Sequence, residues 1–248
     1  MKPRRENMLL RLALLVAVTL AASISKLGSA EPVLRRVTFR EDFTSGSLDA
    51  WQFPFPEDWG ILSEGPLHYL HMKRNREPGV PRRPLQFALL KGLMVGSFEL
   101  ETRVRREGRS MIVVFDYVDT LHFYYAHLSQ DPGAQQPVHN GIFIVNGEPR
   151  KRISATEVRP ALPDPKWHQV RLVRNAITGS INVYMDGQPD PLFSVHDDMF
   201  VCGQIGLGSF DETGDFTDVK LTSEDVGCNL KELTLPASLN GGAIGLVK

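Results

Sequence analysis

The sequence predicts an all-β protein, a β-sandwich of two antiparallel sheets. Short runs of alternating apolar and polar residues recur along the chain, and after position 37 turn residues interrupt it so often that no long stretch keeps a helical period. The clearest example is 167–187, where two alternating runs flank Thr178-Gly179-Ser180. This pattern predicts a β-hairpin with its turn in the middle.

The first thirty residues predict a secretory signal peptide. Arg4 and Arg5 precede the apolar run 12–22, and Gly28-Ser29-Ala30 supplies the small residues that precede a cleavage point. The alternative is an uncleaved anchor, but the run is shorter than the ~20 residues that span a bilayer. We therefore expect cleavage after Ala30, a secreted or periplasmic protein, and no transmembrane segment after cleavage.

Length and charge suit a single extracytoplasmic domain. Loss of residues 1–30 would remove a net charge of +4 and change the formal charge from −1 to −5, which argues against a nucleic-acid partner. We expect one sandwich over 31–225 and a loose tail over 226–248, where no period is sustained. The sequence specifies no oligomeric state.

The chain contains two cysteines, Cys202 and Cys228. In an oxidising compartment they could form a disulfide that ties the segment before Gln204 to the tail; the alternative is two separate thiols. Their spacing does not match a metal-binding pattern.

Three groups of residues resemble one superfamily. The pattern WH-x-V-x-L followed by G-x-I-x-V-Y-x-D-G in 167–187 resembles the central hairpin of concanavalin A-like jelly-roll domains, the laminin-G-like branch in particular, and 204–208 and 216–221 resemble their last two strands. E-D-F-x-x-G-x-L-x-x-W in 41–51 resembles the entry strands of secreted sugar-active jelly rolls, including the bacterial 3-keto-disaccharide hydrolase-like family. The resemblance implies a concanavalin A-like jelly roll that engages carbohydrate.

The segment 98–105 predicts a strand with one apolar face and one charged face. Glu99 and Glu101 stand at i and i+2, roughly 6–7 Å apart, which is within the separation of paired glycosidase carboxylates. The next positions on that face are Arg103 and Arg105. We therefore interpret this face as outward-facing Glu and Arg pairs. The basic, proline-broken segment 72–84 before it predicts an exposed loop.

The segment 111–129 is the richest in side chains suited to a sugar site. Period-two geometry places His122, Tyr124 and Ala126 on one face and Phe123, Tyr125 and His127 on the other. One face must line the core, and a slip of one residue exchanges the two sets. Aromatic rings beside hydrogen-bonding groups suit a sugar, whose C–H faces pack on rings.

Further polar groups follow in 139–152, where Asn146-Gly147 predicts a hairpin turn. If these strands are neighbours, one substrate-binding site would combine Asp116, His122, Tyr124, Tyr125, His127, His139, Asn140, Arg150 and Arg152. The catalytic candidates within that set are Tyr124, Tyr125, His127 and His139. The alternative is that each of these is an ordinary sandwich residue.

Two acids predict a cation site. Asp42 lies at the first strand and Asp218 in the last, and the terminal strands of jelly rolls usually lie side by side. Carboxylate and carbonyl oxygens are the ligands calcium needs, so a structural calcium at Asp42 and Asp218 is a prediction; turn capping is the alternative. No other cofactor is predicted.

Three functions follow from the sequence. The first is non-catalytic binding of a poly- or oligosaccharide on the concave sheet face. The second is a glycan-degrading enzyme, either a hydrolase of 3-keto-glycosides or disaccharides, or a lyase in which a Tyr/His pair acts on a uronate while Arg neutralises its carboxylate. The third is an extracellular protein-interaction module, whose mark would be a large exposed apolar patch.

Overall fold

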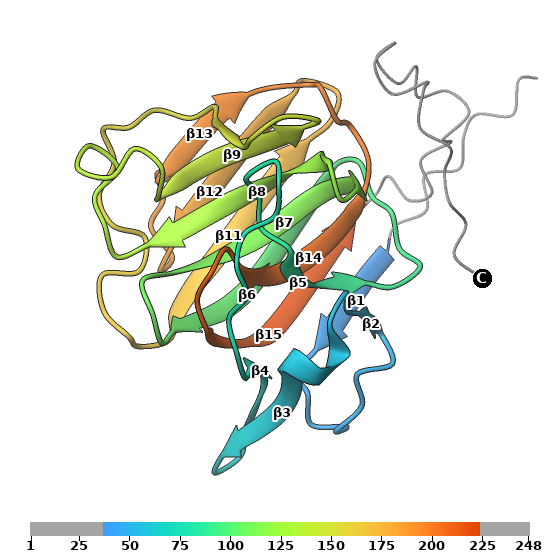
Figure 1. Cartoon of the computed structure of the whole chain (residues 1–248). Helices are drawn as coiled ribbons and strands as arrows, with labels where there is room; N and C mark the ends of the chain where they lie inside the picture. The colour runs from blue at the N-terminus through green and yellow to red at the C-terminus, as the bar shows by residue number, and fades with distance from the viewer. Residues whose placement is uncertain (1–36, 224–248) are drawn as a thin grey trace, which may run out of the picture. The chain divides into compact units, whose positions relative to one another are not determined.

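The computed structural model describes residues 37–223, which form a two-layered β-sandwich (Figure 1). The predicted signal peptide 1–30 and the whole tail 226–248, with Cys228, therefore lie outside the described residues. Apart from η1 (Pro56–Asp58), a short 3-10 turn, every regular element in 37–223 is a strand. No described helix is long and apolar enough to cross a membrane. The all-β prediction is confirmed.

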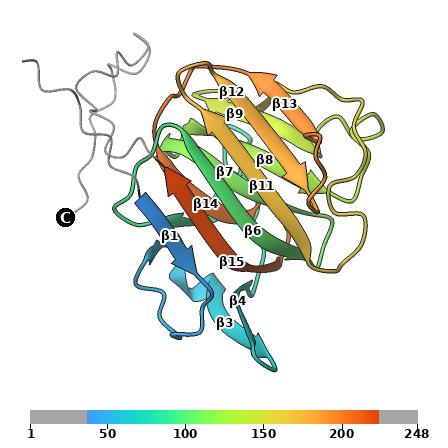
Figure 2. The same ribbon diagram turned by 180° about the vertical axis from the view of Figure 1, so that it is seen from behind.

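Sheet A has eight antiparallel strands (Figure 2). Its strands in spatial order are β13 (Phe193–His196), β12 (Ser180–Met185), β11 (His168–Asn175), β6 (Phe98–Arg106), β15 (Gly214–Ser223), β4 (Leu67–Met72) and β3 (Trp59–Glu64), and β1 (Val37–Glu41) also pairs with β15. The central hairpin β11–β12 and the pairing of the first described strand with the last both match the sequence prediction.

Sheet B has seven antiparallel strands. Its strands in spatial order are β10 (Lys151–Arg152), β9 (Gly141–Asn146), β8 (His122–Ser129), β7 (Ser110–Asp119), β14 (Gln204–Ser209), β5 (Gln86–Leu90) and β2 (Trp51–Gln52). Gly147 has φ +75°, as the predicted Asn-Gly turn before β10 requires.

The main core lies between the two sheets. Strand β6 contributes Phe98, Leu100 and Val104 to it, and its burial alternates residue by residue as predicted. From sheet B, Tyr124 and Ala126 of β8 face this core. The register therefore places Phe123, Tyr125 and His127 on the outer face of sheet B.

The outer face of sheet B carries a second buried cluster. Its members are Phe87, Leu89, Ile112, Val114, Phe123, Tyr125, Phe143, Val145 and Phe210. In Figure 1 the segment between β4 and β5 crosses this face, and Arg82 of that segment contacts Phe210. All eight residues of β8 are buried, because one face of the strand lines the core and the other lies under this cover.

Candidate functional site

Three of the predicted site residues meet on the outer face of sheet B. The Arg150 Nη1 group lies 2.9 Å from the Tyr125 hydroxyl and 3.1 Å from His127 Nδ1. Because a guanidinium can only donate, His127 Nδ1 must accept, and the ring proton is on Nε2. Nε2 then donates to the Ser110 hydroxyl at 2.8 Å. This Tyr125–His127–Arg150 cluster is the candidate site.

Burial keeps both ring residues of the cluster neutral. Burial lowers the pKa of His127 well below 6.5, and the charge of Arg150 lowers it further. Burial raises the pKa of the Tyr125 hydroxyl, although Arg150 opposes that shift. Tyr125 and His127 are 0% and 1% exposed, so a ligand approaching this face meets the half-buried Arg150 first.

Arg150 and Arg82 cover the aromatic floor of the site. The Arg150 guanidinium lies 3.9 Å from the ring centroid of Phe210 and 5.0 Å from that of Phe143. Arg82 lies 4.9 Å from the Phe210 centroid, and its carbonyl accepts the backbone N–H of Arg150 at 2.8 Å. Sequence reasoning missed Arg82, Phe210 and Ser110. Only the basic loop 72–84 carried a signal, and it was interpreted as an exposed loop.

His139, Asn140 and Arg152 flank the cluster. His139 lies beside His127, with ring centroids 5.2 Å apart, and its Nδ1 is 3.0 Å from Asp131. The Asn140 side chain accepts the backbone N–H groups of Ser129 and Ala161 at 3.1 and 3.0 Å and donates to a loop carbonyl. Arg152 donates to several loop carbonyls. Asn140 and Arg152 therefore brace the loop.

Asp116 and Tyr124 lie outside the Tyr125–His127–Arg150 cluster. Asp116, with φ +46° at an irregularity of β7, forms a completely buried ion pair with Arg174 at 3.0 Å. Burial raises its pKa to about 7 against the opposing charge of Arg174. The Tyr124 hydroxyl donates to Asp197 and accepts the backbone N–H of Phe200.

The predicted grouping of these residues into one site is therefore incomplete. Asp116 is held in the interior, and Tyr124 faces the core between the sheets. His122, at the start of β8, lies 2.7 Å from Asp119 and contacts the Phe200 ring. The alternation along β8 separates these side chains from Tyr125 and His127.

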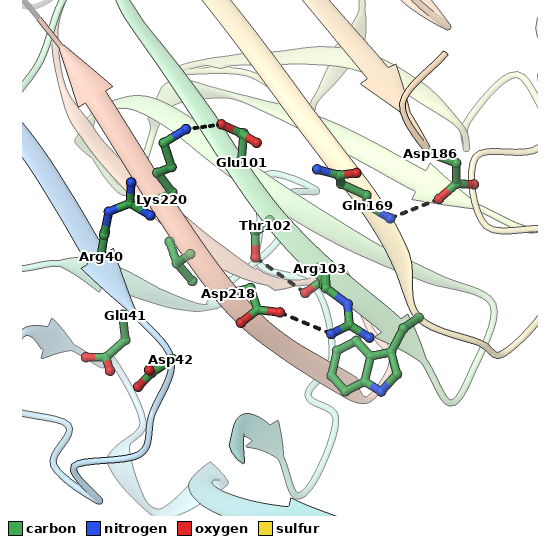
Figure 3. Close-up of a pocket in the computed structure, with 12 residues that line it drawn as sticks. Arg40, Glu41, Asp42, Glu101, Thr102, Arg103, Gln169, Asp186, Asp218 and Lys220 are labelled. Carbon is green, nitrogen blue, oxygen red and sulfur yellow. Dashed lines mark hydrogen bonds and ion pairs between the residues drawn. The ribbon is translucent and has the colours of Figure 1, made fainter. Parts of the chain in front are cut away.

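A separate hollow of about 710 Å³ lies on the outer face of sheet A (Figure 3). It is lined by Arg40, Glu41, Asp42, Glu101, Thr102, Arg103, Trp167, Gln169, Asp186, Asp218, Val219 and Lys220. Four of its eight charged side chains pair with one another: Lys220 with Glu101 at 2.5 Å and Arg103 with Asp218 at 3.1 Å. This outcome matches the predicted outward face of paired charges on β6.

The two acids of the predicted calcium site both line this hollow. Asp42 accepts two hydrogen bonds from Thr44, which lower its pKa, and Asp218 is paired with Arg103. Glu41, Asp42 and Asp218 supply oxygen atoms of the kind calcium prefers, but Thr44 and Arg103 already use part of this capacity. Calcium here stays a prediction.

A third polar group lies at the β4–β15 pairing. His71, Glu107 and Asp215 each place a ligand atom within 4.8 Å of the others. The buried Asp215 carboxylate already bonds His71 at 2.8 Å and Arg105 at 2.7 Å. We therefore interpret this group as a structural network.

Comparison with known proteins supports the fold. No family model matches the chain, and no curated protein matches it. Among solved structures it is similar to the carbohydrate-binding module CBM66 from Bacillus subtilis, with 17% identity, a TM-score of 0.51, and coverage of 70% of this chain and 96% of that one. It is also similar to winged bean acidic lectin complexed with methyl-α-D-galactose, with 12% identity, a TM-score of 0.53, and coverage of 78% and 100%.

A third similar structure is a GH43 protein, BlXynB, from Bacillus licheniformis, with 13% identity, a TM-score of 0.52 and coverage of 74% of this chain. The chain spans 39% of that protein's length. At these identities the likenesses show the fold alone, an antiparallel β-sandwich of the jelly-roll type.

Proposed function

We propose that this protein binds a poly- or oligosaccharide on the outer face of sheet B. The observation that carries the proposal is Arg150, which joins the Tyr125 hydroxyl and the His127 ring above a floor of aromatic side chains. Sugars exchange hydrogen bonds with planar polar groups such as a guanidinium. The rings of Phe143 and Phe210 are each 2% exposed, so they support Arg150 from below and do not contact the sugar. CBM66 and the winged bean lectin, which share the fold, are named for carbohydrate binding, which supports the proposal.

The hollow on sheet A is the competing location. It is open and its volume is in the range of ligand pockets. However, four of its eight charged side chains pair with one another, and Arg103, one of its two arginines, is held by Asp218. On sheet B, Arg82 and Arg150 both lack a carboxylate partner within residues 37–223 and lie over the same ring, Phe210. We therefore place the ligand on sheet B.

The contacts of the cluster favour binding over catalysis. A raised pKa keeps the proton on Tyr125, so its hydroxyl is a poor base. Both nitrogens of His127 are engaged, Nδ1 by Arg150 and Nε2 by Ser110. Binding without product is therefore the primary function that we infer, and a hydrolase or lyase activity is the alternative.

A protein-interaction role has less support. The exposed large apolar side chains of residues 37–223 are Leu62, Val80, Val138, Ile177 and Met199. None is aromatic, whereas protein interfaces are enriched in aromatic anchors.

We also propose export with cleavage after Ala30, on the basis of the charged start and short apolar run of the sequence. The mass and N-terminal sequence of the exported protein test this. A mature chain that begins at Glu31 is expected, and a retained N-terminus would contradict it.

The test of function is a panel of oligosaccharides, measured by calorimetry for binding and assayed for new reducing ends and unsaturated products. We expect saturable binding of at least one glycan without product. Arg150→Gln should weaken it at least about tenfold, since a hydrogen bond from a charged group contributes about 1.5–3 kcal/mol. Arg40→Gln, on the outer side of sheet A, is the matched control and should change affinity less than twofold, a difference of about 0.4 kcal/mol.

Three results would contradict the proposal. Binding to no glycan of the panel would refute carbohydrate recognition. Turnover would make the protein an enzyme and refute the non-catalytic role. Equal losses in the Arg150 and Arg40 variants would refute the location.

A further inference from the structure

The arginines over the aromatic floor lack acidic partners within residues 37–223. On sheet A, Arg103 pairs with Asp218 and Arg105 pairs with Asp215. Within residues 37–223, seven arginines take part in ion pairs. The four arginines beside the sheet B site do not. These four are Arg82, Arg83, Arg150 and Arg152.

Three of the four have donors to spare. Arg152 spends its N–H groups on loop carbonyls, and Arg83 donates to the Pro81 carbonyl at 3.0 Å. Arg150 uses only Nη1, and the side chain of Arg82 makes no hydrogen bond to any described residue. Arg83 also leaves donors unused, among them a buried Nε, but of the four arginines Arg82 and Arg150 are the two whose guanidiniums lie over the Phe210 ring.

These two guanidiniums are held close to one another. Both lie over the Phe210 ring, at 4.9 and 3.9 Å from its centroid. Their backbones are joined by the hydrogen bond from Arg150 N–H to the Arg82 carbonyl. A further backbone bond, from Gly79 N–H to the Arg83 carbonyl at 2.9 Å, closes the turn that carries Arg82. The pair is therefore positioned before any ligand arrives.

Two unpaired cations over an apolar floor favour an anion. Asp211 acts on the cluster from a distance: it raises the pKa of Tyr125 but makes no ion pair with either arginine. A guanidinium presents a planar fork that bonds two oxygens of a carboxylate or sulfate at once. The rings exclude water from one side, which strengthens such a contact.

We propose that the sugar recognised here is acidic, and that Arg82 and Arg150 together hold its carboxylate or sulfate group. This inference rests on the proposed carbohydrate-binding function and names the substrate class. Arg82 presents an exposed guanidinium to the ligand, and the half-buried Arg150 contributes the N–H donors that Tyr125 and His127 do not use.

The test uses ligands that differ only in charge. Oligomers of galacturonate, glucuronate and mannuronate are each compared by calorimetry with their methyl esters, which keep the sugar and remove the charge. A neutral oligosaccharide and its sulfated form make a second pair. We expect at least one acidic member to bind about tenfold or more tightly than its neutral counterpart, with an affinity that falls as salt is raised.

Variants locate the contact. Arg82→Gln is expected to lower the affinity for the acidic ligand about tenfold, because it removes a charged contact to the anion. The weaker binding of the ester should stay nearly unchanged, because the ester has no anion. The variant should fold, since an exposed loop side chain can be replaced without disturbing the fold. Arg40→Gln, which removes the same charge from the other sheet, should change neither. Thermal melting of each variant confirms that it is folded.

The outcomes separate the two proposals. If esters and neutral sugars bind as tightly as the acids, the acidic-sugar inference is overturned and carbohydrate binding stands. If no ligand of either kind binds, the proposed function itself fails. If Arg40→Gln weakens binding as much as Arg82→Gln does, the attraction is a general charge effect and the assigned contact is wrong. Preference for uronates or for sulfates identifies which anion is recognised, and either supports the inference.

Discussion

Because the imidazole of His127 is buried, we can predict how the free energy of unfolding depends on pH. In the folded protein its pKa lies well below 6.5, because the ring is buried and Arg150, His139 and Arg152 add positive charge. The unfolded chain takes up this proton near pH 6.5. As pH falls below 6.5 the unfolded state therefore gains a proton that the folded state refuses, and stability declines by up to about 1.4 kcal/mol per pH unit until the folded pKa is reached.

Asp116 has the opposite dependence. Its pKa is raised from 3.8 to about 7 in the fold, so its contribution is present below pH 3.8 and is lost as pH rises through 7. Between these values the two slopes cancel in part, and the total stability curve of the protein would hide both. The difference between the wild-type protein and a His127 variant removes the Asp116 slope, which both proteins share.

The assay is urea unfolding of the wild-type protein and His127→Gln at pH 7.5, 6.5, 5.5 and 5.0. The wild type should lose its advantage over the variant by about 1.4 kcal/mol for each pH unit below 6.5. Asp116→Asn is the control, and its difference from wild type should change with pH in the opposite sense. A wild-type advantage over His127→Gln that stays constant from pH 7.5 to 5.0 would refute the neutral, enclosed His127.

Three further predictions concern the core, the two tyrosines and the cation. Arg174→Met leaves a buried carboxylate without its partner and should lower the free energy of unfolding by about 3–5 kcal/mol; a loss under about 1 kcal/mol in urea would contradict this. Tyr125→Phe should weaken glycan binding several-fold through Arg150, while Tyr124→Phe should lower stability and spare affinity; calorimetry and melting tell them apart. If calcium binds at Asp42 and Asp218, the melting temperature should be higher in calcium than in chelator, and equal melting temperatures would refute the calcium site.

The local pattern of the sequence is sufficient to predict individual strands and hairpins. The alternation in Phe98–Arg106 predicts a strand with one buried face, because adjacent side chains of a strand point to opposite faces. The turn residues in 167–187 predict the hairpin β11–β12 for an equally local reason.

The site required information that alternation does not carry. Both faces of β8 are buried, so the pattern could not show which of Tyr124 and Tyr125 faces the core. Asp116 was grouped with its sequence neighbours, but its partner Arg174 is 58 residues away on the other sheet. Arg82 is exposed, as the prediction of an exposed loop expects, but its contact with Phe210 is a long-range one that the loop pattern does not show.

The central claim is that an acidic sugar lies on the outer face of sheet B, and amide hydrogen exchange tests it most directly. With a saturating amount of the tightest uronate oligomer, exchange should slow in 79–83 and 148–152, which carry Arg82 and Arg150. The segments that line the hollow on sheet A, 40–42 and 218–220, should exchange as they do without ligand. Slowing confined to those sheet A segments would contradict the account and place the sugar in the hollow of Figure 3.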